Sequence, residues 1–141
     1  MMNYATEDIH TLARTIWGEA RGENMQGRIG VAWVVLNRTA RRAWPDRVAE
    51  VCTQPKQFSC WNPGDPNLPK LLGVGLDSAS YRGSMFAALG VLDGVFPDPT
   101  GGADHYHAEG IFPWWAEHMP ITQTIGAHIF LTSTTNQGRG A

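Results

Sequence analysis

Residues 6–20 alternate between apolar and polar positions with the period of an α-helix. At about 100° per residue the apolar positions fall on one face, and Glu19 lies at the edge of that face. Thr6 is placed to cap the helix, with Glu7 and Asp8 at the positive end of its dipole. The pattern therefore predicts a helix whose last turn holds Glu19 at the boundary between core and solvent. The apolar members of the face are Ile9, Leu12, Ala13, Ile16 and Ala20.

Further helices are expected along the first two thirds of the chain. Residues 24–38, with a capping Asn at the first position, are apolar nearly all round, which predicts a helix buried at the centre of the fold. Residues 48–51 predict a short apolar turn or helix. Asp77 or Ser78 can cap another helix that runs to about Leu92. The side chains of this last helix that are expected to point inward are Ala79, Met85, Phe86, Leu89 and Leu92.

The other segments lack a helical period. Residues 54–75 are rich in Pro, Gly and Asn and predict a long loop, and long loops in compact domains tend to carry function. Residues 104–108 and 124–131 are each expected to form a short strand. Residues 132–141 are small and polar and predict a flexible tail. The chain is therefore predicted to have a mostly helical α+β fold with a small β element, as one domain over residues 1–131.

Composition fits one globular domain, because 43% of the 141 residues are apolar. A net charge of −2 and the lack of a nucleic-acid-binding motif or phosphate loop argue against nucleic acid and nucleotide cofactors. Six Trp residues suit either core packing or flat walls on which sugars stack. A run of arginines predicts a solvated helix end or, alternatively, a landing site for an anionic polymer. Its members are Arg28, Arg38, Arg41, Arg42 and Arg47.

Targeting signals and cysteines bear on the compartment. The polar residues 1–10 lack the charged start and apolar run of a signal peptide, and no apolar run approaches the roughly 18 residues of a membrane span. We therefore expect synthesis in a cytoplasm, no membrane insertion, and release by another agent before any action outside. Cys52 and Cys60 are expected to be reduced thiols, or a disulfide if the protein meets an oxidising compartment.

Two carboxylates near the end of the first helix are candidates for acid–base chemistry. Glu19, partly buried at the negative end of a helix dipole, is favoured in its protonated form, as a general acid requires. Glu23 follows four residues later, on the same face if the helix continues, but Gly22 indicates that the helix ends. Spacing alone favours two surface acids, whereas a pair of carboxylates is the usual requirement of a glycosidase.

Histidines near the C-terminus suggest a second chemistry. His105 and His107 would lie on one face of a strand, where Asp104 or His128 could complete a metal site. No HExxH motif accompanies them, so hydrogen bonding within a polar cleft is favoured and no metal is predicted.

Three blocks of sequence follow one another along the chain. They are residues 12–37 (LARTIWGEARGENMQGRIGVAWVVLN), residues 54–61 (QPKQFSCW) and residues 106–130, which contain the segments YHA, PWW and TIGAHIF. With them the chain resembles the SleB-type cell wall hydrolases, the catalytic domain of spore-cortex-lytic enzymes that also occurs in bacteriophage endolysins. The resemblance implies a lysozyme-like fold and cleavage of the β-1,4 bond between N-acetylmuramic acid and N-acetylglucosamine in peptidoglycan. It places the catalytic acid at Glu19. It also implies a lytic transglycosylase that needs no cofactor and forms 1,6-anhydro ends, with a hydrolytic muramidase as the alternative.

The resemblance also suggests a substrate cleft. The Trp side chains are expected either to stack on sugars there or to pack in the core. Glu23 is expected either to have a structural role or to polarise Glu19. Asp104 and His105 depart from the apolar or aromatic residues expected there, and Leu131 replaces an aromatic residue. The residues expected to contact substrate are Glu23, Gln57, Phe58, Ser59, Trp61, Tyr106, His107 and Trp114.

A bare catalytic domain without a signal peptide is typical of a monomeric phage endolysin, held in the host cytoplasm and acting on the cell wall after release. Two rival functions remain. One is a metal-dependent N-acetylmuramoyl-L-alanine amidase or a peptidase built on His105, His107 and His128. The other is a non-catalytic glycan-binding module.

Overall fold

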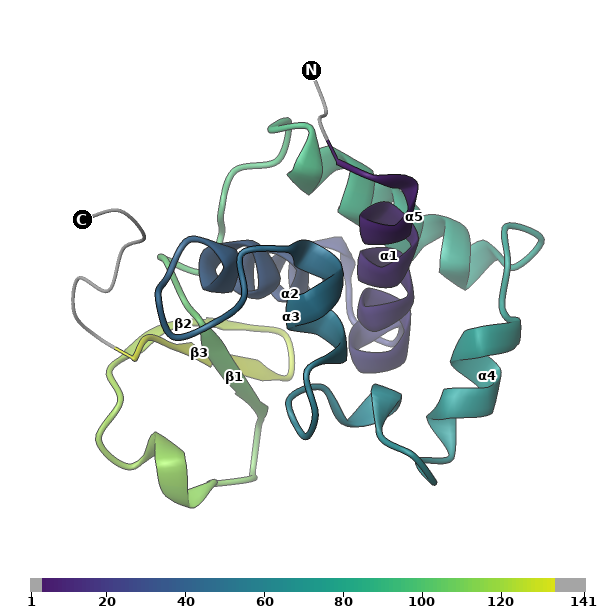
Figure 1. The fold of residues 1–141 in the computed structure, drawn as a ribbon. Helices are drawn as coiled ribbons and strands as arrows, with labels where there is room; N and C mark the ends of the chain where they lie inside the picture. The colour runs from purple at the N-terminus through teal and green to yellow at the C-terminus, as the bar shows by residue number, and fades with distance from the viewer. Residues whose placement is uncertain (1–3, 134–141) are drawn as a thin grey trace.

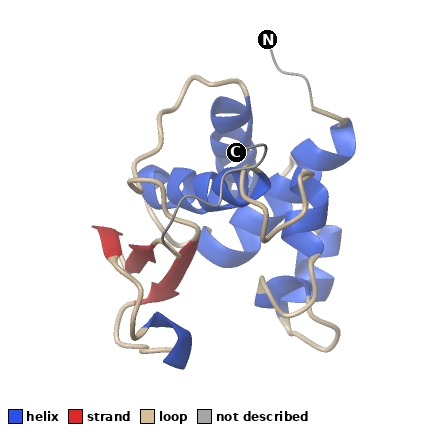
Figure 2. Cartoon of the chain, turned by 60° about the vertical axis from the view of Figure 1, so that its left-hand side comes forward, coloured by secondary structure: helices blue, strands red, loops and turns tan. Residues whose placement is uncertain are grey.

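The computed structural model describes residues 4–133, which form a group of helices with a small sheet against one side (Figures 1 and 2). The predicted mostly helical α+β fold is confirmed. The elements in chain order are α1 (Thr6–Ala20), α2 (Met25–Thr39), α3 (Val48–Thr53), η1 (Ser59–Trp61, a 3₁₀ turn), α4 (Asn67–Gly73), α5 (Ala79–Leu92), β1 (His105–Ala108), η2 (Trp114–Ala116, a 3₁₀ turn), β2 (Ile121–Ile125) and β3 (His128–Leu131).

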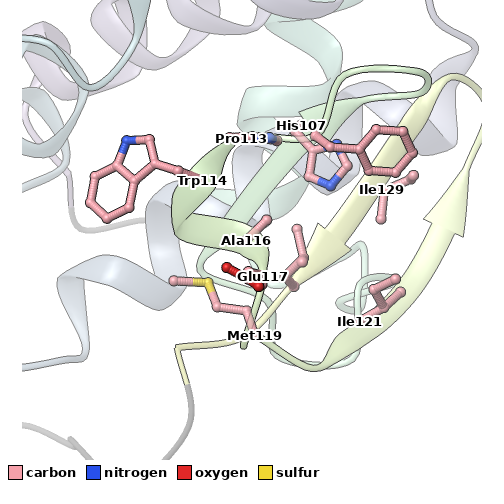
Figure 3. Close-up of a pocket in the computed structure, with 10 residues that line it drawn as sticks. His107, Pro113, Trp114, Ala116, Glu117, Met119, Ile121 and Ile129 are labelled. Atoms are coloured by element: carbon pink, nitrogen blue, oxygen red, sulfur yellow. The ribbon is translucent and has the colours of Figure 1, made fainter.

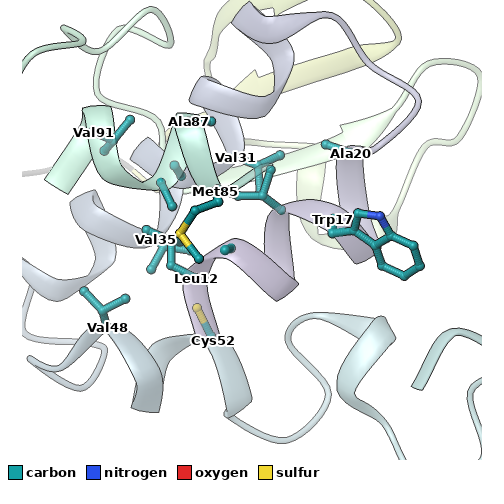
Figure 4. Close-up of a cluster of buried hydrophobic side chains, with 14 of the residues drawn as sticks. Leu12, Trp17, Ala20, Val31, Val35, Val48, Cys52, Met85, Ala87 and Val91 are labelled. Atoms are coloured by element: carbon teal, nitrogen blue, oxygen red, sulfur yellow. The ribbon is translucent and has the colours of Figure 1, made fainter. Parts of the chain in front are cut away.

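The main hydrophobic core lies where α1, α2, α3 and α5 meet. Figure 4 shows Leu12, Val35 and Met85 converging from three helices, with Cys52 from α3 beside them. The buried side chains of α1 include most of the predicted apolar face. The predicted α2 is confirmed, and the Asn24 side chain caps it by accepting a hydrogen bond from Gly27 N at 2.9 Å. The capping prediction for α1 is wrong, because the capping position is Ala5 and no side chain caps it.

Helix α5 begins after Ser78, whose hydroxyl accepts from Tyr81 N, as one of the two predicted caps requires. Two of its predicted inward residues, Ala79 and Phe86, are exposed. The buried face of α5 is instead centred on small residues and Tyr81, so that Phe86 points outward and contacts Phe96, with ring centroids 5.4 Å apart.

The predicted loop 54–75 contains two short helices, η1 and α4. An aspartate before α4 assists its start, since Asp65 Oδ1 accepts from Asn67 N at 2.8 Å. Such short elements complete too few turns to show a period, and their prolines and glycines resemble those of a loop. The loop prediction is therefore wrong for these two stretches.

The sheet is antiparallel with the strand order β1-β3-β2, and it packs against α2. The single strand predicted over 124–131 is wrong, because a tight turn divides it into parts of β2 and β3. Gly126 allows this turn with φ +56°, a conformation that favours glycine. A small second cluster joins sheet to helix: Phe130 packs close to Gly30 of α2, where a Cβ atom would lie 2.7 Å from the ring.

The segment after β3 is hydrogen-bonded at its start. Thr132 N donates to Pro120 O at 3.1 Å, and Ser133 N donates to Asp104 Oδ1 at 2.8 Å. The rest of the predicted tail lies outside the described residues. Within residues 4–133, every helix is too short or too polar to span a bilayer.

Candidate active site

The carboxyl group of Glu19, in the last turn of α1, meets the sheet at Tyr106 of β1. The Tyr106 hydroxyl donates a hydrogen bond of 2.5 Å to Glu19 Oε1, which joins residues far apart in sequence. Both side chains line a polar pocket of about 360 Å³ between the helices and the sheet. The residues around this pocket, called the Glu19 pocket below, are Glu19, Arg38, Lys56, Gln57, Phe58, His105, Tyr106 and Trp115.

Tyr106 is held on its apolar side by three rings. The ring centroids of Phe58, His128 and Phe130 lie 6.4, 4.9 and 5.9 Å from that of Tyr106. Burial, together with the nearby carboxylate of Glu19, raises the pKa of Tyr106 well above its ordinary value of 10.0. The phenol therefore stays protonated and remains a hydrogen-bond donor to Glu19.

Cys60 of η1 lies on another side of the same carboxyl group. Burial raises the pKa of the Cys60 thiol, and both the charge of Glu19 and a hydrogen bond to it act in the same direction. Gly18 makes this close approach possible, because a Cβ atom there would lie 2.7 Å from Cys60 Sγ. Cys52 is also buried, its pKa is raised to about 12 by burial, and the two thiols are not joined in a disulfide.

Arg38 of α2 is buried and lines the Glu19 pocket, whereas Arg42 and Arg47 of the arginine run are exposed to solvent. Its Nε donates to Asp104 O at 2.8 Å, and Nη1 donates to Gln57 Oε1 at 3.3 Å. The guanidinium lies 5.1 Å from the ring centroids of both Trp44 and Phe58. Burial lowers the pKa of Arg38, but a guanidinium remains charged at neutral pH. One cation thus joins α2 to the loop at 57 and to the start of β1.

Asp104 is fully buried and supports the edge of the pocket. Its carboxylate oxygens accept from Arg41 Nη1 at 2.5 Å, from Ser133 and from His105. Burial by itself raises the pKa of Asp104, but the hydrogen bonds from His105 and Ser133 outweigh it and lower the pKa to about 2. Asp104 is therefore an anion throughout the neutral range.

His105 is oriented by this buried anion. Its Nδ1 lies 2.8 Å from Asp104 Oδ1, and its ring lies between those of Trp44 and Trp115, with centroids 5.6 and 5.1 Å away. A carboxylate only accepts hydrogen bonds, so Nδ1 carries the proton and Nε2 of the neutral ring is an acceptor. The sequence favoured hydrogen bonding within a polar cleft for His105, but it did not identify Asp104 as the partner that orients the ring.

Two of the predicted substrate-contacting residues, Glu23 and Ser59, do not line the Glu19 pocket. Glu23 Oε1 accepts from Ala127 N at 3.0 Å and thereby joins the end of α1 to the turn between β2 and β3. This contact favours the structural alternative for Glu23. Ser59 is exposed at the start of η1.

Three further predicted contacts line other cavities. Trp61 donates from Nε1 to Thr15 Oγ1 at 2.9 Å, packs against the main core, and lines a cavity of about 580 Å³. His107 and Trp114 line an apolar cavity of about 470 Å³ (Figure 3). The structure thus gathers Glu19, Gln57, Phe58 and Tyr106 in one pocket. The substrate-contact role of every predicted residue stays a prediction.

The histidines of the rival metal site have other contacts. His105 pairs with Asp104, and His107 Nδ1 lies 3.0 Å from Ala108 O. Burial lowers the pKa of His128, although the charges of Glu23 and Glu19 oppose this. Among residues 4–133, no three or more His, Cys, Asp or Glu side chains are grouped so that they could hold a metal ion.

A model of the cell wall hydrolase family matches residues 22–131, which is most of the chain. The chain belongs to the cell wall hydrolase family. Glu19 lies just before the matched segment. The recognition of a SleB-type hydrolase is confirmed, because the curated proteins that the chain matches include spore cortex-lytic enzymes and the solved structures include SleB catalytic domains.

Individual relatives of this cell wall hydrolase domain are similar over nearly all of its length. The spore cortex-lytic enzyme of Halalkalibacterium halodurans is 34% identical over 128 residues, which cover 90% of this chain and 35% of that protein. That of Oceanobacillus iheyensis is 33% identical over 132 residues, which cover 90% and 42%. The chain therefore spans less than half the length of these curated relatives.

Two solved structures share the fold of this cell wall hydrolase domain. The catalytic domain of the Bacillus cereus SleB protein has a TM-score of 0.75 at 28% identity and covers 92% of this chain and 93% of its own. The catalytic domain of the germination-specific lytic transglycosylase SleB from Bacillus anthracis has a TM-score of 0.76 at 28% identity, with 92% and 98% covered.

The expected localisation is corrected by these relatives. The sequence suggested an endolysin held in a host cytoplasm, but the curated proteins that match this cell wall hydrolase are spore cortex-lytic enzymes. The endolysin expectation had been drawn from the absence of a signal-peptide pattern and of a wall-binding module in this sequence, which spans only part of its relatives.

Proposed function

We propose that this domain cleaves the β-1,4 bond between N-acetylmuramic acid and N-acetylglucosamine in peptidoglycan as a lytic transglycosylase, with Glu19 as the catalytic residue. The observation that carries the proposal is the Glu19 carboxyl group, held by the Tyr106 hydroxyl in a polar pocket between α1 and β1. The likeness to the Bacillus anthracis lytic transglycosylase domain supports the same reaction.

A single carboxyl group is sufficient for both proton transfers. Protonated Glu19 gives its proton to the glycosidic oxygen as the bond to the anomeric carbon breaks. The resulting carboxylate then takes the proton from the C6 hydroxyl of the muramoyl residue, whose oxygen bonds to the anomeric carbon. Glu19 ends protonated, no water is consumed, and the product has a 1,6-anhydro end. The Tyr106 hydroxyl stabilises the carboxylate between the two transfers.

The other polar side chains of the Glu19 pocket have roles in binding. Gln57 is oriented by Arg38, and His105 is oriented by Asp104, so each presents a fixed polar group to the substrate. These contacts suit the hydroxyl and acetamido groups of amino sugars. The pocket would thus align the muramoyl C6 hydroxyl before the bond breaks.

The decisive experiment compares the wild-type domain with Glu19→Gln and Glu23→Gln on purified peptidoglycan. General acid–base catalysis contributes about 10²–10⁴-fold, so Glu19→Gln should lower the release of soluble fragments to about a thousandth. Glu23→Gln is the matched control at the same helix end and should remain active, because an amide oxygen still accepts from Ala127 N. Retained activity of a folded Glu19→Gln variant would falsify the assignment.

Mass spectrometry of the same fragments distinguishes the reactions. Fragments with 1,6-anhydro muramoyl ends, one water lighter than the hydrolysis products, support the transglycosylase. Reducing muramoyl ends would indicate a muramidase, a second candidate because the Asp104-oriented His105 could hold a water in the Glu19 pocket. Free stem peptides with chelator-sensitive activity would indicate a metal-dependent amidase, and wall binding without fragments would indicate a glycan-binding module.

A further inference from the structure

A second cavity, of about 580 Å³, lies beside the Glu19 pocket, between the end of α3 and the residues that follow η1. Lys56 lines both this cavity and the Glu19 pocket, so one side chain forms a wall that the two spaces share. A ligand bound at Glu19 can therefore extend past Lys56 into the second cavity, called the Lys56 cavity below. Its lining residues are Thr53, Pro55, Lys56, Trp61, Asn62 and Pro63.

Lys56 is held at this boundary by a strained turn. Gln57 N donates to Gln54 O at 3.2 Å, which leaves Pro55 and Lys56 as the two central residues of the turn. Lys56 has φ +64° and is the only residue other than glycine among residues 4–133 with a positive φ. Proline followed by a positive φ matches a type II turn, whose third position favours glycine. A strained lysine at the wall of a candidate active site indicates that its side chain has a function there.

The charge and lining of the Lys56 cavity suit a short acidic peptide. Among the described residues that line it, Lys56 is the only one with a charged side chain, and it is exposed to a ligand. The Asn62 amide can bond with the N–H and C=O groups of a peptide. Trp61 is fixed by the hydrogen bond from its Nε1 to Thr15, and with the two prolines it offers apolar surface to small side chains. A lysine cation among such groups favours a ligand with a carboxylate over an uncharged sugar.

We propose that the Lys56 cavity binds the stem peptide of the muramoyl residue held at Glu19, with the Lys56 ammonium group paired to a carboxylate of that peptide. The inference rests on the proposed function and deepens it, because it makes peptide-substituted glycan the preferred substrate. The stem peptide branches from the lactyl ether of N-acetylmuramic acid and carries free carboxylates. A muramoyl residue in the Glu19 pocket thus brings its peptide to the pocket wall, where Lys56 is placed.

The test compares Lys56→Gln with Lys56→Gly, both in the Glu19→Gln background so that binding is measured without cleavage. Lys56→Gln removes the charge and keeps the strained turn, whereas Lys56→Gly removes the charge and relieves the turn. The matched control is Lys70→Gln, because Lys70 is the other lysine of the chain, is exposed on α4 and lines neither cavity.

Two probes are titrated by isothermal calorimetry. One is a soluble, uncross-linked glycan strand with intact stem peptides, and the other is the same strand after an amidase has removed the peptides. Thermal melting followed by circular dichroism checks that each variant is folded.

Both Lys56 variants should bind the peptide-bearing strand roughly fivefold more weakly than the Glu19→Gln parent, whereas Lys70→Gln should bind it as the parent does. Added salt should weaken binding by the parent much more than binding by Lys56→Gln, since it screens the ion pair. Lys56→Gly should melt no lower than the parent, because glycine adopts the turn without strain. A purely structural role of Lys56 would leave the binding by a folded Lys56→Gln variant unchanged, which would overturn the proposal.

The peptide-free strand identifies the carboxylate. Its removal of the peptide exposes the lactyl carboxylate of the sugar, which is the other anion within reach of this wall. A loss of binding in the Lys56 variants that is equally large on both strands would place the cation at the lactyl group and overturn the proposal. Equal binding of the two strands by the parent would overturn it as well.

Failure of the proposed function would look different. A fully active Glu19→Gln variant would refute catalysis by Glu19, whereas the preference for the peptide-bearing strand is a separate measurement of binding. Conversely, an inactive Glu19→Gln variant whose binding does not depend on Lys56 would remove only the stem-peptide site.

Discussion

The helical region and the sheet region of this hydrolase domain are stabilised by different means. The helices share one large core in which side chains such as Leu12, Ile16 and Val35 are completely buried. The sheet shares with α2 only a small cluster around Phe130, and its first strand is held by the buried Asp104 and its hydrogen-bond partners. Figure 1 shows the two regions meeting along α2 and the end of α1.

The site takes a different contribution from each region. The rigid helical core fixes the position of Glu19, while the sheet supplies Tyr106 and His105 through strand register and buried charge. A change in the helical core should therefore alter stability with little effect on catalysis by the folded molecules. A change at the sheet side of the site should affect catalysis at a smaller cost in stability.

The largest stability effect is expected for Leu12→Ala. Removing a fully buried Leu side chain leaves a cavity in the helical core, so the free energy of unfolding should fall by about 3 kcal/mol. Leu72→Ala is the control, because Leu72 is exposed on α4 and its loss should change stability by less than about 0.5 kcal/mol. Urea denaturation measures both. Similar losses in the two variants would show that the helical core is not the main source of stability.

A smaller, pH-dependent loss is expected for Asp104→Asn. Because the pKa of Asp104 is lowered from 3.8 to about 2 in the folded state, its charge stabilises the fold fully above pH 3.8, and this stabilisation is lost as pH falls through about 2. The difference in unfolding free energy between wild type and variant should be about 2 kcal/mol at neutral pH and shrink in acid. Urea denaturation at a series of pH values measures this difference, and Asp46→Asn is the control because Asp46 is exposed. A difference independent of pH would contradict the role of the charge.

Tyr106→Phe should have the smallest effect on stability and a clear effect on catalysis. Removing the hydroxyl takes away the hydrogen bond to the Glu19 carboxylate, which corresponds to a loss of roughly tenfold or more in kcat. Tyr4→Phe, at the surface before α1, should retain full activity. Initial rates of fragment release and thermal melting separate the two quantities. If kcat is unchanged, the hydrogen bond has no catalytic role.

The sequence predicted the helical region better than the sheet because helical order is local. Three long helices repeat their apolar positions often enough to reveal their faces. Residue type also identified Asn24 as a cap and Ser78 as one of two candidates for another. The sheet depends on pairs between distant residues, such as Tyr106 with Phe130, which no local pattern records. The turn at Gly126 was accordingly missed, and one strand was predicted where the chain forms a hairpin.

The candidate site was predictable to the extent that its residues belong to recognisable motifs. Glu19 follows from its helix position and the family resemblance, which also suggested Gln57, Phe58 and Tyr106. Arg38 was missed as a site residue because its role depends on tertiary contacts. For His105 a role in a polar cleft was expected, but its partner Asp104 was not identified. A buried arginine in a run of arginines has no local signature, and its contacts with Gln57 and the start of β1 exist only in the folded chain.

Gly18 restricts how this candidate site can vary among sequences. The residue before the proposed acid touches η1 so closely that even a methyl group would displace Cys60, whereas the neighbouring Gly22 faces open space. A side chain at position 18 would also crowd Leu71 of α4, so both η1 and α4 would have to give way. A mutational library of this domain should consequently recover almost no residue but glycine there, even where the acid itself has been replaced and selection acts on folding alone.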